Sequence, residues 1–138
     1  TGVSYVVTSK DGKNPTVTYS GNRNKKAKTI TVPSTVTVDG VTYKVTAIAD
    51  NAFKNNKKVT KVVIPGNIIT IGKNAFKGCS KLKTIQIKST KLTSKSISKN
   101  AFKGISKKVT IKVPKKKLKA YKKLFRKKGL SKKVKMKS

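Results

Sequence analysis

The segment that decides the fold runs from Ile48 to Pro65 and reads IADNAFKNNKKVTKVVIP. Its pattern returns as IGKNAFKGCSKLKTIQIK from Ile71 and as ISKNAFKGISKKVTIKVP from Ile97. The copies therefore begin 23 and then 26 residues apart. Repeats of about this length are typical of solenoids, in which one unit cannot bury its apolar face alone and must stack on neighbours. The sequence thus predicts a β-rich solenoid of stacked units within a single domain of 138 residues.

Aliphatic residues recur at fixed positions within each copy. Each copy ends with two of them, separated by one residue: Val62 and Ile64, Ile85 and Ile87, and Ile111 and Val113. This spacing places both side chains on one face of a strand, so each unit is expected to supply a short strand to a parallel sheet. The phenylalanines of the three Asn-Ala-Phe motifs are expected to stack in the core, which makes them unavailable for stacking on nucleic-acid bases: Phe53, Phe76 and Phe102.

Asparagine precedes each Ala-Phe pair, at Asn51, Asn74 and Asn100. Asparagine tolerates turn conformations and bonds nearby backbone groups, so these residues are expected to form a structural ladder of turns and no binding site. The single cysteine, Cys79, occupies a repeat position where a small apolar side chain would pack under a loop. A catalytic thiolate is the alternative, but the chain has no histidine that would activate it.

Residues 1–47 are expected to form a β-rich N-terminal cap. Val36 to Val45 reads VTVDGVTYKV, and Asp39-Gly40 between alternating apolar residues predicts a hairpin with a type I′ turn. Thr29 to Pro33 reads TITVP, like the end of a repeat, and indicates a degenerate first repeat. Further outer strands are expected to contain Val3, Tyr5, Val7, Val17 and Tyr19.

Residues 48–114 hold the three clear repeats, and residues 115–138 carry a different, basic pattern. Leu118, Tyr121, Leu124 and Phe125 recur at helical spacing, and Gly129 is placed to end the helix. Val134 and Met136 then restart a period of two. This pattern predicts a helix over the open end of the stack followed by a closing strand, a C-terminal cap. A basic amphipathic helix lying on a membrane is the alternative.

The charge of the chain is extreme. The chain has 36 Lys and Arg residues but only three acidic residues, Asp11, Asp39 and Asp50, so its formal net charge is +33. Such a charge repels itself within the compact state and attracts polyanions. Disorder is a second reading of this composition, but the aliphatic residues recur at fixed positions instead of being diluted among the lysines. No stretch approaches the roughly 20 consecutive apolar residues that span a bilayer.

These motifs carry a family resemblance. The units I-x-x-N-A-F, each followed by its aliphatic strand, and the entry segment VTYKVTAIADNAF resemble the BspA-like branch of the leucine-rich repeat family over about residues 29–114. The resemblance implies a bacterial surface or secreted protein that adheres to host proteins, to other bacteria or to matrix. The third unit departs from the pattern, because its first strand aliphatic, Val109, lies one position later than Val59 and Leu82.

The residue inventory argues against an enzyme. The chain has no His and no Glu, and its three Asp are scattered, so it offers no carboxylate pair, no general base near neutrality and no metal-ligand cluster. Gly72, Gly78 and Gly104 belong to repeat turns and lack the spacing of a nucleotide loop. A lysine nucleophile would need an orienting partner that the sequence does not show. We therefore expect no catalytic site and no cofactor.

Two binding surfaces are candidates. The first is the row of residues between the core positions of the strands, which would contact a host or matrix protein: Lys61, Val63, Thr84, Gln86, Thr110 and Lys112, with Thr29 and Thr31 before them. The second is a set of turn lysines at shared offsets, which would stack into positive stripes: Lys54, Lys77 and Lys103, and also Lys73 and Lys99. These stripes would bind an anionic polymer such as teichoic acid or another anionic glycan of the cell wall.

Other partners are less favoured by residue type. The residue types argue against nucleic acid, because Arg23 and Arg126 are the only arginines and the aromatic residues are expected mostly in the core. In the remaining alternative, the lysines serve only as a solvated face of the protein. The chain begins at Thr1 without an initiator methionine, which indicates a processed or excised segment. We expect a monomeric fragment of an extracellular or bacterial cell-surface protein.

Overall fold

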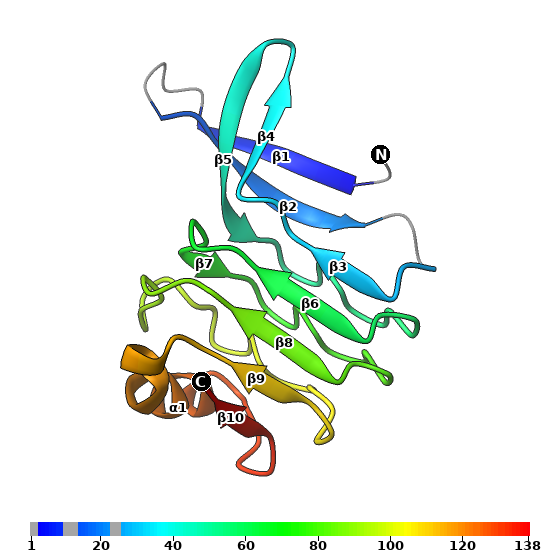
Figure 1. Ribbon diagram of the computed structural model, residues 1–138, viewed down its shortest axis with the longest axis vertical. Coiled ribbons are helices and arrows are strands. Elements are labelled where there is room, and N and C mark those ends of the chain that lie inside the picture. Colours follow the sequence, from blue (N-terminus) through cyan, green and yellow to red (C-terminus); the bar gives the residue numbers. More distant parts are fainter. Residues whose placement is uncertain (1–2, 10–13, 23–25) are drawn as a thin grey trace.

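The computed structural model describes residues 3–9, 14–22 and 26–138, and its repeats are stacked along one axis, with their strands arranged in two sheets (Figure 1). Its elements follow in the order β1 (Val3–Ser9), β2 (Thr16–Asn22), β3 (Thr29–Thr31), β4 (Thr35–Val38), β5 (Val41–Ile48), β6 (Lys61–Ile64), β7 (Thr70–Ile71), β8 (Thr84–Ile87), β9 (Thr110–Lys112), a 3₁₀ turn (Lys115–Lys117), α1 (Leu118–Lys127) and β10 (Lys135–Lys137).

Each stacked unit of the solenoid is here called a rung. One sheet, the ladder sheet, contains one strand from each rung. Its order is β3-β6-β8-β9-β10, and every neighbouring pair is parallel. The central residue of each rung is buried and in register with the next: Ile30, Val62, Ile85, Ile111 and Met136. The predicted parallel strands are therefore confirmed, and TITVP forms the first rung.

The second sheet mixes strand directions. β1 pairs antiparallel with β2, β2 pairs parallel with β5, and β5 pairs with both β4 and β7. Asp39 and Gly40 join β4 to β5 with φ angles of 51° and 78°, the positive values that a type I′ hairpin turn requires. The predicted hairpin is confirmed. Below it Ile48, Ile71 and Ile97 form a continuous line, because Ile48 pairs with Ile71 and Ile71 bridges to Ile97.

Stacked aromatic rings fill the core between the two sheets. The centroid of Phe76 lies 5.4 Å from that of Phe53 and 6.4 Å from that of Phe102, with interplanar angles of 12° and 15°. The stack predicted from the repeats is thus present, and it is longer than expected. Tyr19 extends it beyond Phe53 at 5.4 Å, and Phe125 extends it beyond Phe102 at 4.1 Å. One ring per rung matches the strand spacing of about 5 Å, so the rings stay in contact along the axis.

Backbone hydrogen bonds join the turns that contain the repeated asparagines. Asn51 and Asn74 have φ angles of 59° and 54°, the left-handed region that asparagine tolerates. The amide of Asn51 donates to the carbonyl of Lys73, and the amide of Asn74 donates to that of Asn100. Beneath these turns Cys79 is buried, as expected, and its thiol donates to the carbonyl of Phe53.

The C-terminal helix lies at the end of the stack opposite the β4–β5 hairpin (Figure 1). Tyr121 and Phe125 are buried, while Leu118 and Leu124 pack half-buried against the core, as the helical spacing predicts. The phenol of Tyr121 donates to the carbonyl of Ser89 at 2.9 Å and accepts from the amide of Leu92 at 3.2 Å. These two bonds tie the helix to the loop that follows β8. Gly129, with φ 101°, ends the helical segment and leads to β10.

Candidate binding surface

The predicted strand row lies on the solvent side of the ladder sheet. Lys61, Thr84 and Thr110 share one line across the strands, and Val63, Gln86 and Lys112 share a second. Lys61 and Lys112 are exposed, whereas the two threonines and Gln86 are partly exposed. Val63 is the exception, with 9% of its surface exposed. The row is therefore polar and basic, with one nearly buried apolar position.

The row continues at both ends. Thr29 and Thr31 precede it on β3, as expected, and both are exposed. Lys135 and Lys137 extend it on β10 and are also exposed. Sequence reasoning missed these two lysines as part of the row, because the last rung lacks the Asn-Ala-Phe motif that marks the other repeats. The Lys-Met-Lys alternation was the available signal.

The predicted turn lysines lie on a different edge of the stack, and all five are exposed: Lys54, Lys77, Lys103, Lys73 and Lys99. Adjacent turns are joined by backbone bonds, such as that from the amide of Asn55 to the carbonyl of Lys77 at 2.8 Å. The methylene groups of Lys77 lie over Gly104, since a Cβ atom added to Gly104 would lie 2.6 Å from Cγ of Lys77. Asp50 places a negative charge beside these lysines, because its carboxylate accepts a hydrogen bond from the amide of Lys73 at 2.7 Å.

A third basic feature, which sequence reasoning missed, lies where the chain enters the ladder strands. Lysine directly precedes a buried aliphatic residue in four rungs, at Lys58, Lys81, Lys108 and Lys133, and we call these lysines the amino rim. In three of the rungs a side-chain oxygen two residues earlier accepts the amide of the rim lysine: Asn56 to Lys58, Ser106 to Lys108, and Ser131 to Lys133. The repeated NKKV and SKKV tetrapeptides were the signal for this feature.

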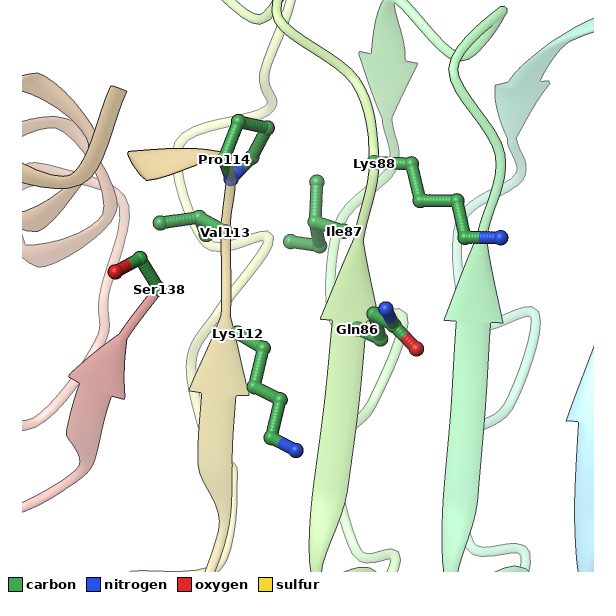
Figure 2. A pocket seen from close by; sticks show the side chains of 7 residues that line it. All are labelled: Gln86, Ile87, Lys88, Lys112, Val113, Pro114 and Ser138. Carbon is green, nitrogen blue, oxygen red and sulfur yellow. The ribbon is translucent and has the colours of Figure 1, made fainter. Parts of the chain in front are cut away.

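Two hollows flank the middle of the ladder sheet. One, of about 540 Å³, lies at the amino rim and is lined by Thr60, Ser80, Lys81, Leu82, Lys83, Lys108 and Thr110. The other, of about 310 Å³, lies at the opposite ends of β8 and β9 and is lined by Gln86, Ile87, Lys88, Lys112, Val113, Pro114 and Ser138. Figure 2 shows the second hollow, with the side chains of Gln86, Lys88 and Lys112 standing out from the strands.

Within the described part of the chain, which contains no His or Glu, the Cys and Asp residues form no group of three or more that could hold a metal ion. None of its helices has the length and apolar character needed to cross a bilayer. Burial raises the pKa of the Tyr19 phenol, with the neighbouring Tyr5 adding to the effect, and burial also raises the pKa of Tyr121. Both phenols serve the core, so they offer no group for chemistry at the surface.

The comparison with known families is decisive for the fold. The BspA type leucine rich repeat region matches residues 45–138, in six copies. The chain belongs to this leucine-rich repeat family. The match begins later than the resemblance in the sequence and runs through the C-terminal segment, so the matched region includes the residues of α1 and β10. No protein with a curated description matches the chain.

Several solved structures are similar. A leucine-rich repeat protein from Bacteroides capillosus ATCC 29799 matches with 26% identity and a TM-score of 0.61, over 82% of this chain and 78% of that one. One from Bacteroides ovatus ATCC 8483 matches with 28% identity and a TM-score of 0.55, over 80% of this chain and 30% of that one. A leucine rich cell surface protein from Faecalibacterium prausnitzii A2-165 matches with 25% identity and a TM-score of 0.50, over 82% and 35%. The chain thus spans about a third of the latter two.

Proposed function

We propose that the protein is a non-enzymatic binding module, displayed on a bacterial surface or secreted, that holds a host or matrix protein on the solvent face of its ladder sheet. The observation that carries this proposal is the register of the ladder strands, which aligns the outward residues of five rungs into two continuous lines. Stacked repeat proteins bind through extended surfaces of this kind. The cell-surface description of the Faecalibacterium protein supports the proposed location.

The chemistry of the row indicates the character of the partner. Lys61, Lys112, Lys135 and Lys137 are exposed on it, and no acidic residue lies among its positions. Threonine and Gln86 between them supply hydrogen-bonding groups. Complementary potentials guide specific association, so the partner should present an acidic face.

The test of this proposal blocks the row without changing its charge. Thr84→Tyr with Thr110→Tyr would place two bulky side chains on adjacent strands, where aromatic residues are well tolerated. Thr42→Tyr on β5 is the matched control, because Thr42 is an exposed strand threonine on the other sheet. Serum and matrix proteins would be immobilised and titrated at physiological salt. Saturable binding that the row variant loses and the control retains is expected; equal binding by both variants would remove the row as the ligand surface.

A second candidate is electrostatic attachment to an anionic polymer of the cell wall, such as teichoic acid or an anionic glycan. It is favoured by the exposed lysines of adjacent turns, Lys54, Lys77 and Lys103, which backbone bonds hold in successive rungs. Screening by salt separates the two candidates. Binding to every polyanion that disappears by moderate salt favours the polymer, whereas saturable binding to one protein at physiological salt favours the row.

A further inference from the structure

We infer that the hollow at the amino rim is a dedicated subsite for an oxyanion, a phosphate or sulfate ester, carried by one sugar or polyol unit of an extracellular anionic polymer. The inference rests on the polymer candidate and adds to it a defined site in place of a general field of positive charge. The subsite consists of the seven residues that line the 540 Å³ hollow.

The hollow arises where the repeat pattern is broken. One residue separates the buried aliphatic from the strand in the first two clear repeats, as in Val59-Thr60-Lys61 and Leu82-Lys83-Thr84, but Thr110 follows Val109 directly. Because Thr84 pairs with Thr110, Val109 lies beside Lys83. Val109 is fully buried while Lys83 is exposed, so the third repeat buries its aliphatic side chain one position later, and nearer its strand, than the second. The edge of the second repeat therefore stands beside an open space.

Backbone hydrogen bonds fix the positions of the residues around this space. The amide of Lys83 donates to the carbonyl of Thr60, and the amide of Thr110 donates to the carbonyl of Lys83, both at 2.8 Å. These two bonds join three lining residues, Thr60, Lys83 and Thr110, across consecutive rungs. Lys108 is positioned by its own turn, in which its amide donates to Oγ of Ser106. The backbone framework is therefore set before a ligand arrives, and binding has to order only the exposed side chains, chiefly those of the lysines.

The lining chemistry suits an oxyanion. Lys81, Lys83 and Lys108 are exposed cations, and no acidic residue is among the seven lining positions. Charge-assisted hydrogen bonds from ammonium groups to oxyanions are stronger than neutral ones. Ser80 and Thr110 add hydroxyl donors. The hydroxyl of Thr60 donates to the carbonyl of Lys28. The hydroxyl oxygen of Thr60 therefore remains able to accept a hydrogen bond from a sugar or polyol hydroxyl.

The size of the hollow argues for more than a free ion. Its volume of 540 Å³ lies within the range of roughly 300–1,000 Å³ that is typical of small-molecule sites. A lone phosphate or sulfate would occupy a small part of it, whereas a sugar or polyol unit bearing the ester would fill more. Lys58 and Lys133 continue the amino rim on either side, so a polymer leaving the hollow would follow further cations.

The experiment removes equal charge from two surfaces. One variant carries Lys81→Gln, Lys83→Gln and Lys108→Gln, and the control carries Lys54→Gln, Lys77→Gln and Lys103→Gln. Affinity would be measured by calorimetry at low and at physiological salt for two probes, a heparin octasaccharide and a glycerol-phosphate oligomer. We expect the rim variant to lose about tenfold more affinity than the control for at least one probe, because three charge-assisted contacts are removed together. A preference for the sulfated probe would indicate a host glycan, and a preference for the phosphodiester would indicate a wall polymer.

A second variant keeps the charge and the fold. Thr110→Val removes one hydroxyl from the hollow and is well suited to a strand, so we expect about threefold weaker binding with an unchanged melting temperature. Equal losses in the two triple variants, with no effect of Thr110→Val, would overturn the subsite while leaving electrostatic attachment in place. Absence of binding by the unmodified protein to both probes, even at low salt, would overturn the subsite and the polymer candidate together.

Discussion

At the scale of single residues, the molecule depends on a few side chains that join one rung to the next. Phe76 is fully buried in the middle of the aromatic stack, between Phe53 and Phe102. These positions were predictable because a residue that repeats in every unit must meet its own counterparts. Lys135 and the amino rim were missed, because lysine is so frequent in this chain that single lysines carry no positional signal, and only the Lys-Met-Lys alternation and the NKKV and SKKV tetrapeptides mark them.

Phe76→Ala should lower the free energy of unfolding by about 3–5 kcal/mol, since it removes a large side chain from a core that cannot close around the gap. Thermal and denaturant unfolding would measure the change. Phe76→Leu is the control, because it keeps an apolar side chain at the position and should cost less. A change within about 0.5 kcal/mol for the alanine variant would contradict the stacked core.

At the scale of elements, the strands with a repeated two-residue alternation were predictable, and so were the hairpin and the helix. β7 was not, because Thr70–Ile71 is too short to carry an alternation, and its strand character comes from pairing with β5. The pattern of β1 was only partly informative. The expected outer strands are present as β1 and β2, and Tyr5 packs against the core, but Val7 is 43% exposed, because β1 lies at the edge of its sheet.

The phenol of Tyr121 bonds the helix to the loop after β8, and Tyr121→Phe tests that connection. The carbonyl of Ser89 and the amide of Leu92 would lose their partner, at a cost of about 1–3 kcal/mol. Burial raises the pKa of Tyr121 above its unfolded value, so the neutral phenol is favoured by folding, and this stability is lost as pH rises through the folded pKa. The difference between the two proteins should therefore shrink above about pH 10. Tyr43→Phe on the hairpin is the control, and a difference independent of pH would contradict the role of this phenol.

Deleting residues 115–138 should expose Phe102 and the edge of β9, because Phe125 and β10 cover them in the intact protein. Uncovered apolar rungs and strand edges promote association. We expect aggregation or loss of cooperative unfolding, measured by light scattering and calorimetry. A truncated protein that stays monomeric with an unchanged melting temperature would show that this segment is a free basic arm, and it would favour the membrane alternative.

At the scale of the whole molecule, charge opposes the compact state. The formal charge of +33 is spread over stripes of lysine at rung spacing, well within the screening length of about 8 Å at physiological salt. The fold withstands this repulsion because its core is continuous from Tyr19 to Phe125. Net charge was evident from composition, and the repeat offsets predicted the outward row and the turn stripes, but the continuation of the row onto Lys135 and Lys137 depends on the register of β10, which only the folded chain defines.

Stability should therefore rise with salt, and it should rise at far lower concentration with a multivalent anion that binds the folded state. Melting temperatures in sodium chloride and in heparin would measure both effects. Replacing Lys54, Lys77 and Lys103 by Gln should weaken each of them, because three stacked charges are removed. A melting temperature that falls with added salt would show that repulsion between lysines does not limit stability.

The ladder sheet ends on β3 at one side and on β10 at the other, and both are parallel members of the same series. Two molecules placed head to tail would bring the β10 of one beside the β3 of the next, and because such a contact does not close, it would continue into a filament. Lys135 and Lys137 are exposed on the terminal strand and repel a second copy that is equally basic. We therefore expect these lysines to keep apart molecules whose ladder sheets would otherwise continue one another, and we expect a saturating polyanion to remove that barrier.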